Sequence, residues 1–169
     1  MKPPSLADMR EKMAAQRAQM ETKRENSQLM AQAVMLKVHR ELYVRSDGLV
    51  GKMMLRVPCL LLTVTGRTSG NKHTVALVYA IDGDDYVVVA SKGGGEHDPQ
   101  WFVNIAHNTA VELQIGRVRS KATAEIIDQN DRRYERLWRL VNTNNHGRYY
   151  RYQHRTKRPI PIVLLQPVD

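Results

Sequence analysis

Short runs of β-branched and aromatic residues, separated by turns, make up most of the chain after residue 60 and restrict its fold. The runs span residues 63–65, 75–81, 86–90, 111–115, 121–127 and 160–165. They do not alternate regularly with crossover helices, as the strands of a doubly wound parallel sheet do. An antiparallel barrel suits them better, because closure hides the edges of the sheet. The sequence therefore predicts a mainly β fold with flanking helices.

Two helices are expected among the strands. One begins in the segment DPQWFVNIAHN, where Asp98 is expected as the N-cap and Pro99 as the first helical residue. The other spans about residues 130–142, with four apolar residues at helical spacing: Tyr134, Leu137, Trp138 and Val141.

A longer helix is expected over residues 6–44, which contain few glycines or prolines. Its later half carries Met30, Val34, Val38 and Leu42 at four-residue spacing, and the segment SDGLVGK ends it. The earlier half has a weak stripe of Met9, Met13 and Met20 among mixed charges, typical of a solvated helix, with a membrane-surface or partner-binding helix as the alternative. We expect residues 1–44 to form a helical extension and residues 45–169 the barrel.

Composition favours a cytoplasmic protein. A hydrophobic content of 42% is enough for a core, and the chain has neither an apolar run long enough to span a bilayer nor a signal-peptide pattern. The single cysteine, Cys59, rules out an internal disulfide and fits a reducing compartment. Association with the inner face of the membrane through the first helix remains an alternative.

The basic charge is concentrated near the C-terminus. Of the formal net charge of +9, nearly all the excess lies in residues 132–158, which hold nine Arg or Lys against Glu135. An acidic partner is expected, and a nucleic acid, an anionic lipid or a phosphorylated or carboxylated small molecule would each satisfy this charge. The basic residues are Arg132, Arg133, Arg136, Arg139, Arg148, Arg151, Arg155, Lys157 and Arg158.

The turn GRTSG at residues 66–70 lies between two expected strands and has the composition of a phosphate cradle. Gly66 and Gly70 let the backbone approach a ligand, Thr68 and Ser69 offer hydroxyls, and Arg67 offers a planar fork for an anionic oxygen. The spacing matches neither a Walker motif nor a dinucleotide-binding fingerprint. A plain hairpin turn is the alternative.

A second basic, glycine-rich segment, ASKGGGEHDP, follows another strand and precedes an expected helix. Ser91 and Lys92 stand before three consecutive glycines, a composition that suits an anion. We expect this loop and the GRTSG turn to converge on one ligand.

Three stretches together resemble the deazaflavin-dependent nitroreductase family, the split β-barrel reductases that use coenzyme F420. They are LLLTVTGRTSGNKHTVALVY, DDYVVVASKGGGEHDPQWFVNIAHNTAVELQIG and YRYQHRTKRPIPIVLLQP, and the similarity covers roughly residues 37–168. The resemblance implies a split β-barrel of the FMN-binding type. It also implies that Arg67, Thr68, Ser69 and Lys92 hold the cofactor phosphate and nearby polar groups, while Gly93 and Gly94 let the backbone approach. Trp101 and Asn104 would shape the adjoining wall. The remaining expected cofactor-binding residues are Gly70, Lys72, His73 and Ser91.

The chain departs from the family pattern after the turn, where Lys72 and His73 stand in place of Pro-Arg. A lysine substitutes only as a point charge, without bidentate geometry. Val78 stands where some members carry a tyrosine, so a more apolar pocket is expected. The basic segment, with Lys37 and Arg40 as additions, would then bind the lactyl-oligoglutamate tail of the cofactor.

The resemblance also implies catalysis by hydride transfer to an electron-poor enone, quinone or nitroaromatic. Tyr149 and Tyr152 share a helix face at the spacing of the family's substrate-covering tyrosines, and we expect one of them, or Ser91, to polarise the acceptor or assist its protonation. The alternative is that the tyrosines only pack the lid.

Other functions stay open at this point. A split barrel can bind FMN, heme or a fatty acid without catalysis. The segment RYYRYQHRTKR has the composition of a module that binds single-stranded nucleic acid, although we expect no nucleic-acid partner. No metal is expected, because the six histidines lack the spacing of metal ligands.

Overall fold

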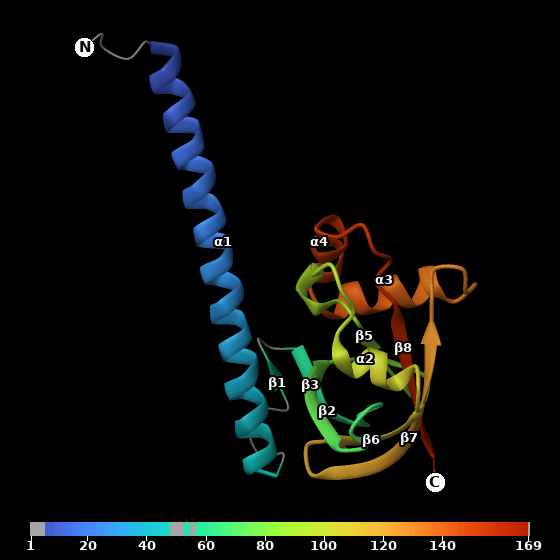
Figure 1. Cartoon of the computed structure of the whole chain (residues 1–169). Coiled ribbons are helices and arrows are strands. Elements are labelled where there is room, and N and C mark those ends of the chain that lie inside the picture. Colours follow the sequence, from blue (N-terminus) through green and yellow to red (C-terminus); the bar gives the residue numbers. More distant parts are fainter. Residues whose placement is uncertain (1–5, 48–52, 55–56, 169) are drawn as a thin grey trace. The chain divides into compact units, whose positions relative to one another are not determined.

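The computed structural model describes residues 6–47, 53–54 and 57–168, with the side chains of the first helix described in part. It divides into two units, Met1–Val38 and His39–Asp169 (Figure 1). The first unit is helical, and the second contains the sheet. Each unit is described separately below.

The helix α1 spans Leu6–Arg45, which confirms the helix expected over residues 6–44, including its charged earlier half. It ends before the segment SDGLVGK, whose residues 48–52 lie outside the described residues. The side chain of Met9 lies outside them too. The apolar stripe is exposed: Met30, Val34, Val38 and Leu42 are each between 51% and 70% accessible.

In the described residues, eight strands form one antiparallel sheet. They are β1 (Met53–Met54), β2 (Val57–Thr65), β3 (Lys72–Val78), β4 (Ala80–Asp82), β5 (Asp85–Val89), β6 (Ala110–Ile115), β7 (Val118–Ile127) and β8 (Ile162–Val168). The order is β1-β2-β6-β7-β8-β5-β4, and β3 pairs with the other side of β2. Since β3 and β4 are joined through Tyr79 alone, this stretch reaches from β2 back to β5 and closes the split β-barrel, as expected from the sequence.

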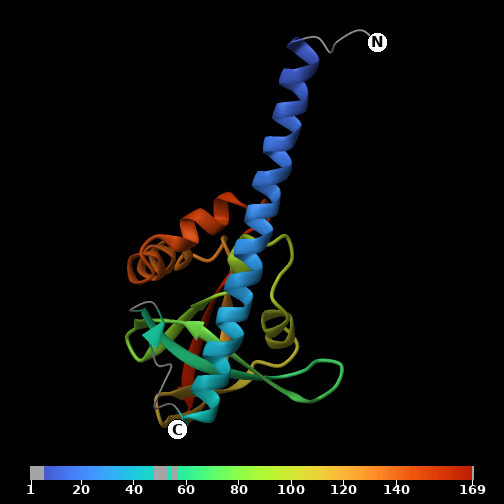
Figure 2. The same cartoon turned by 90° about the vertical axis from the view of Figure 1, so that its left-hand side faces the viewer.

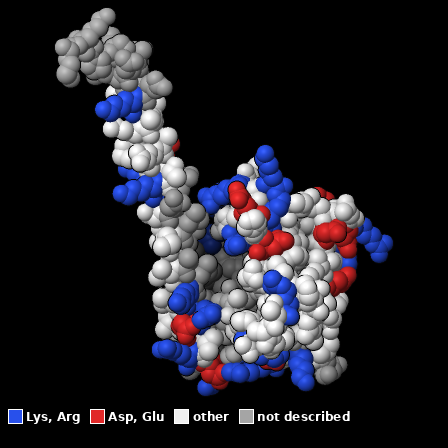
Figure 3. Space-filling view, viewed as in Figure 1, with Lys and Arg blue, Asp and Glu red and all other residues white. Residues whose placement is uncertain are grey.

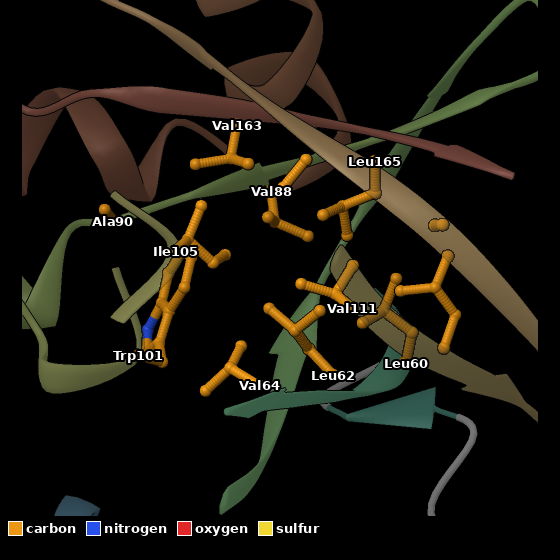
Figure 4. Packing of buried hydrophobic residues seen from close by; sticks show 13 residues of the cluster. Leu60, Leu62, Val64, Val88, Ala90, Trp101, Ile105, Val111, Val163 and Leu165 are labelled. Atoms are coloured by element: carbon orange, nitrogen blue, oxygen red, sulfur yellow. The ribbon is translucent and has the colours of Figure 1, made fainter. Parts of the chain in front are cut away.

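The interior of the barrel is filled by alternate residues of β2 and its neighbours. Leu60, Leu62 and Val64 point inward, as the period of two along a strand requires. Trp101 and Ile105 reach them from the helix α2 (Gln100–Ile105), and Figure 4 shows the indole beside Ile105. The position of α2 is thus fixed by the core.

A second apolar layer covers the outer face of β5 and β8. Figures 1 and 2 show α3 (Tyr134–Asn144) and α4 (Arg148–His154) together at this side of the barrel. The four residues predicted for the buried face of α3 are all buried, which confirms that helix. They pack with Tyr149 of α4 and with strand residues that include Val87, Ile162 and Leu164.

The C-terminal turns of α1 belong to the barrel unit. The side chain of Tyr43 is fully buried against Cys59 and Leu61 of β2. Its hydroxyl donates to the Cys59 carbonyl oxygen at 3.1 Å and accepts from the Gly116 N–H at 2.9 Å. Cys59 therefore packs in an apolar layer, as expected.

Several sequence-based boundaries are wrong: β2 begins at Val57 rather than at residue 63, and β7 begins at Val118 rather than at residue 121. The run predicted as one strand over 75–81 is two strands, because the chain changes partner at Tyr79. The last strand begins at Ile162, since two prolines, Pro159 and Pro161, precede it, and it runs on to Val168. Asp98 is not an N-cap: Pro99 occupies that position, and the Asp98 carboxylate binds Arg158 instead.

Within the part of the chain that the structure describes, no helix combines the length and apolar character needed to cross a bilayer.

Candidate functional site

The GRTSG turn joins β2 to β3 and is a closed hairpin turn. The Gly66 N–H donates to the Asn71 carbonyl oxygen, and the Gly70 N–H donates to that of Gly66, both at 2.8 Å. Gly70 has a φ of +68°, which favours glycine. Gly66 is buried, and a Cβ there would lie 2.8 Å from the Ser69 hydroxyl, so a larger residue would displace that side chain. The turn presents the side chains of Arg67, Thr68 and Ser69 to solvent.

Arg67 is attached to α2 by Asn104, which is buried. The Asn104 side-chain oxygen accepts from the Arg67 backbone N–H at 3.2 Å and lies 3.5 Å from its guanidinium. The guanidinium also donates to Gln100 at 3.2 Å. The structure thus brings together two predicted site residues, Arg67 and Asn104, and Figure 2 shows the turn beside α2.

The glycine-rich loop begins where β5 ends and forms a short 3-10 turn, η1 (Lys92–Gly94). Lys92, Gly93 and Gly94 have φ values of +46°, +66° and +85°. Three successive residues in the left-handed region form a sharp turn that is costly for the one lysine among them. The Lys92 side chain is exposed.

Two glycines of this loop have different surroundings. A Cβ at Gly93 would meet nothing within 4 Å, so a ligand can approach that position closely. A Cβ at Gly94 would lie 2.5 Å from the Tyr152 carbonyl oxygen. Gly94 is therefore needed for the packing of α4 against the loop, which the family resemblance alone does not indicate.

The other predicted site residues differ in exposure. Ser91 is only 8% exposed, and Trp101 is buried within the barrel core. Lys72 is exposed, and its ammonium lies 3.1 Å from the Glu112 carboxylate, so this cation is already paired. The imidazole of His73 lies against Gly66.

Tyr149 and Tyr152 do share a face of α4, with ring centroids 6.1 Å apart. Tyr149 is 6% exposed and packs on Trp138, and burial raises the pKa of its phenol well above 10.0. Tyr152 is only half-buried, and the Arg155 guanidinium carbon lies 5.9 Å from its ring centroid. Tyr152 is thus the more accessible of the two tyrosines. The buried ring of Tyr149 packs against it.

The basic segment is partly neutralised by acids elsewhere in the sequence. Arg133 binds Glu125 and Asp131, and its guanidinium lowers the pKa of Asp131 to about 2. Arg136 holds Asp82 through two hydrogen bonds, of 2.5 and 2.7 Å. Figure 3 shows acidic side chains interspersed with basic ones on this face of the barrel unit.

Arg158 is bound to Asp98, and Arg40 to Glu41 and the Thr74 carbonyl oxygen. These arginines are therefore poor candidates for an acidic ligand. Among the described ion pairs none involves the other six basic residues of the segment: Arg132, Arg139, Arg148, Arg151, Arg155 and Lys157.

A separate shallow depression lies over β6 and β7, lined by Thr63, Glu112, Gln114 and Lys121 among others. It contains none of the predicted site residues.

Sequence reasoning missed two residues that shape the site. Arg158 is attached to the glycine-rich loop rather than free, and Gln153 of α4 holds the backbone that leads to it. The pairing of Arg158 carried no local signal, because its partners lie about sixty residues earlier in the chain.

The split barrel with its flanking helices is a fold found among flavin- and deazaflavin-binding proteins. Residues 34–167 match the model of the F420H(2)-dependent quinone reductase family. The chain belongs to this family, which confirms the resemblance.

Two relatives support that membership. The F420H(2)-dependent quinone reductase Rv1261c of Mycobacterium tuberculosis is 42% identical over 132 residues, which cover 78% of this chain and 89% of the relative. The solved structure of an F420-H2 dependent reductase, FDR-A, is 33% identical with a TM-score of 0.58, over 64% of this chain and 94% of that one.

The heme storage protein HutZ of Vibrio cholerae shares the fold alone, at 13% identity and a TM-score of 0.51, over 66% of this chain and 82% of that one.

The residues present fit the acidic cofactor of this family. A phosphate is bound by cationic and hydroxyl donors, and the exposed side chains of the Arg67 turn and of Lys92 provide them. The unobstructed position at Gly93 leaves room for close backbone approach.

Proposed function

We propose that this protein reduces a quinone-type acceptor with reduced coenzyme F420, which it binds between the GRTSG turn and the Ser91–Gly95 loop. The observation that carries the proposal is the attachment of Arg67 to α2 through Asn104, because α2 directly follows the loop that carries Lys92. The cofactor, when bound, supplies a hydride from a ring carbon. The chain has to hold and orient it.

Arg67, Thr68, Ser69 and Lys92 would hold the phosphate. Asn104 orients Arg67, because its side-chain oxygen accepts from the arginine backbone. Gly93 would allow the backbone to contact the cofactor. The cations of α4 and the following turn, Arg151, Arg155 and Lys157, are exposed and suit an oligoglutamate tail.

Conversion of a quinone to a quinol takes one hydride and one proton, so the site needs a proton donor at the quinone oxygen. The O–H of a tyrosine phenol can serve as the proton donor in such a step. We assign this role to Tyr152, supported by its greater exposure, and assign Tyr149 to positioning Tyr152. Ser91 stays a second candidate for polarising the acceptor.

Titration with coenzyme F420 and with FMN in parallel tests the cofactor. We expect the intrinsic fluorescence of the protein to be quenched by micromolar F420 and not by FMN. Turnover of reduced F420 with a panel of quinones, enones and nitroaromatics then tests the acceptor class, and we expect quinones to be the best substrates. Tight binding of FMN with none of F420 would contradict the proposal.

We further propose that the N-terminal part of α1 contacts an anionic membrane surface. The helix exposes Met13, Met20 and Met30 together with Lys12, Arg17 and Lys23. Co-sedimentation with anionic liposomes should decrease when residues 1–28 are deleted, with neutral liposomes as the control. Equal sedimentation of the full and shortened chains would exclude this role.

A further inference from the structure

Arg158 lies just before β8 and holds the glycine-rich loop at both of its ends. Its side chain is 13% exposed. One terminal nitrogen donates to the carbonyl oxygens of Ala90 and Ser91, both at 3.0 Å, where the loop leaves β5. Its Nε donates to the Gly95 carbonyl oxygen at 2.9 Å, and its other terminal nitrogen binds the Asp98 carboxylate at 2.7 Å.

The loop between these contacts needs such support. Lys92, Gly93 and Gly94 all have positive φ, and two hydrogen bonds close the turn, from the Gly94 N–H to Ser91 and from the Gly95 N–H to Lys92. A non-glycine residue in the left-handed region persists only where its surroundings impose it. Here the Arg158 guanidinium imposes this conformation, because it donates hydrogen bonds to the chain on both sides of the turn.

Arg158 is in turn fixed by α4. The Gln153 side chain donates to the Arg158 carbonyl oxygen at 2.9 Å and accepts from the Ile160 N–H at 3.0 Å. The Tyr152 carbonyl oxygen lies so close to Gly94 that only glycine fits there. One helix therefore carries the accessible tyrosine and also fixes the loop that carries Lys92.

We propose that Arg158 is a positioning residue that couples the cofactor loop to the tyrosine helix, so that Lys92 and Tyr152 act on cofactor and acceptor in a fixed relative geometry. The inference rests on the proposed function, because it is this loop that we place against the cofactor phosphate. It replaces the interpretation of Arg158 as a free cation for the acidic tail. The planar guanidinium group is required at this position, because a lysine ammonium cannot bind all four acceptors at once. The acceptors are three carbonyl oxygens and the Asp98 carboxylate.

Variants Arg158→Lys and Arg158→Gln test the coupling, with Arg119→Gln as the matched control. Arg119, in β7, also forms one guanidinium–carboxylate pair, with Asp47 at 2.6 Å, and this pair does not involve the glycine-rich loop. The first readout is amide hydrogen exchange of residues 90–98 in the cofactor-free protein. We expect exchange about tenfold faster in both Arg158 variants and wild-type exchange in Arg119→Gln.

The second readout is the Kd for coenzyme F420 by fluorescence titration. We expect it to rise about tenfold in both Arg158 variants. Wild-type affinity in Arg158→Lys with a loss in Arg158→Gln would show that charge alone matters, and would overturn the proposal. So would unchanged exchange of the loop in Arg158→Gln.

Asp98→Ala provides a milder test if the Arg158 variants do not fold, because the Asp98 side chain is partly exposed. It releases one end of the loop, and we expect about threefold faster exchange there and about threefold weaker F420 binding. Wild-type values for both would overturn the coupling. If the wild-type protein does not bind F420 while loop exchange still accelerates in the variants, the support by Arg158 stands and the proposed function fails.

Discussion

The side-chain oxygen of Asn104 accepts a hydrogen bond from the backbone N–H of Arg67 at 3.2 Å, and this contact joins the β2–β3 turn to α2. The two residues are far apart in sequence, and Asn104 is 6% exposed. A buried amide that fixes an exposed arginine is an arrangement that orients a ligand-binding cation before the ligand arrives.

Asn104→Ala should weaken F420 binding although Asn104 need not touch the ligand. Removal of the acceptor leaves Arg67 free to move, and we expect the Kd to rise about fivefold and the free energy of unfolding to fall by about 1 kcal/mol. Asn108→Ala is the control, since Asn108 lies just beyond the same helix and is exposed. Equal effects of the two substitutions would argue against this orienting role.

Arg67 itself should matter through its shape as well as its charge. Arg67→Lys retains the charge and loses the bidentate fork, so we expect F420 to bind about tenfold more weakly, with a larger loss in Arg67→Ala. Fluorescence titration of the two variants at two salt concentrations measures these losses of affinity and their dependence on charge. Wild-type affinity in Arg67→Ala would remove this turn from the cofactor site.

The two tyrosines of α4 should be distinguishable by kinetics. Tyr152→Phe removes the accessible phenol, and we expect kcat with a quinone to fall about a hundredfold while the Kd for F420 changes little. Tyr149→Phe should cause a smaller loss, because Tyr149 acts through packing. If both variants turned over quinones at the wild-type rate, neither phenol would have a chemical role.

Alkaline pH should destabilise the protein through its buried tyrosines. Burial raises the pKa of Tyr149 above its unfolded value of 10.0, so the folded state holds its proton more tightly. The stabilising contribution is complete below pH 10 and is lost as pH rises through the folded-state pKa. Urea unfolding at pH 8 and above pH 10 should show a smaller loss for Tyr149→Phe than for wild type. An identical loss in both would contradict this assignment.

Gly93 and Gly94 form a matched pair for testing the packing of the loop. Gly93→Ala encounters only the strain of a positive φ, which costs about 1 kcal/mol. Gly94→Ala also places a methyl group 2.5 Å from the Tyr152 carbonyl oxygen, and we expect a loss of about 3 kcal/mol or more. Thermal and urea unfolding measure both, and equal losses would show that α4 is not packed on the loop.

Much of the fold could be predicted from local patterns. The short β-branched strands and the apolar face of α3 depend on periodicity, which a single sequence displays. The change of partner at Tyr79 could not be predicted, because residues 75–81 have the same strand-like pattern on both sides of it. Asp98 has the residue type and position of an N-cap, but a long-range arginine competes for its carboxylate.

The candidate site was predictable in composition and less so in its contacts. The glycines, Arg67 and Lys92 could be selected from the sequence because turns with such residues suit anions. The pairing of Lys72 with Glu112 across β2, and the attachment of Arg158 to the loop, depend on which strands become neighbours. Charge counts along a sequence therefore overestimate the cations that are available to a ligand.

A crystal structure of the complex with coenzyme F420 is the most direct measurement of the central claim, that both cationic turns bind the same cofactor. We predict that the phosphate lies within hydrogen-bond distance of Arg67 and Ser69, with Lys92 and the Gly93 backbone on the same molecule. A cofactor bound away from either turn would contradict the account.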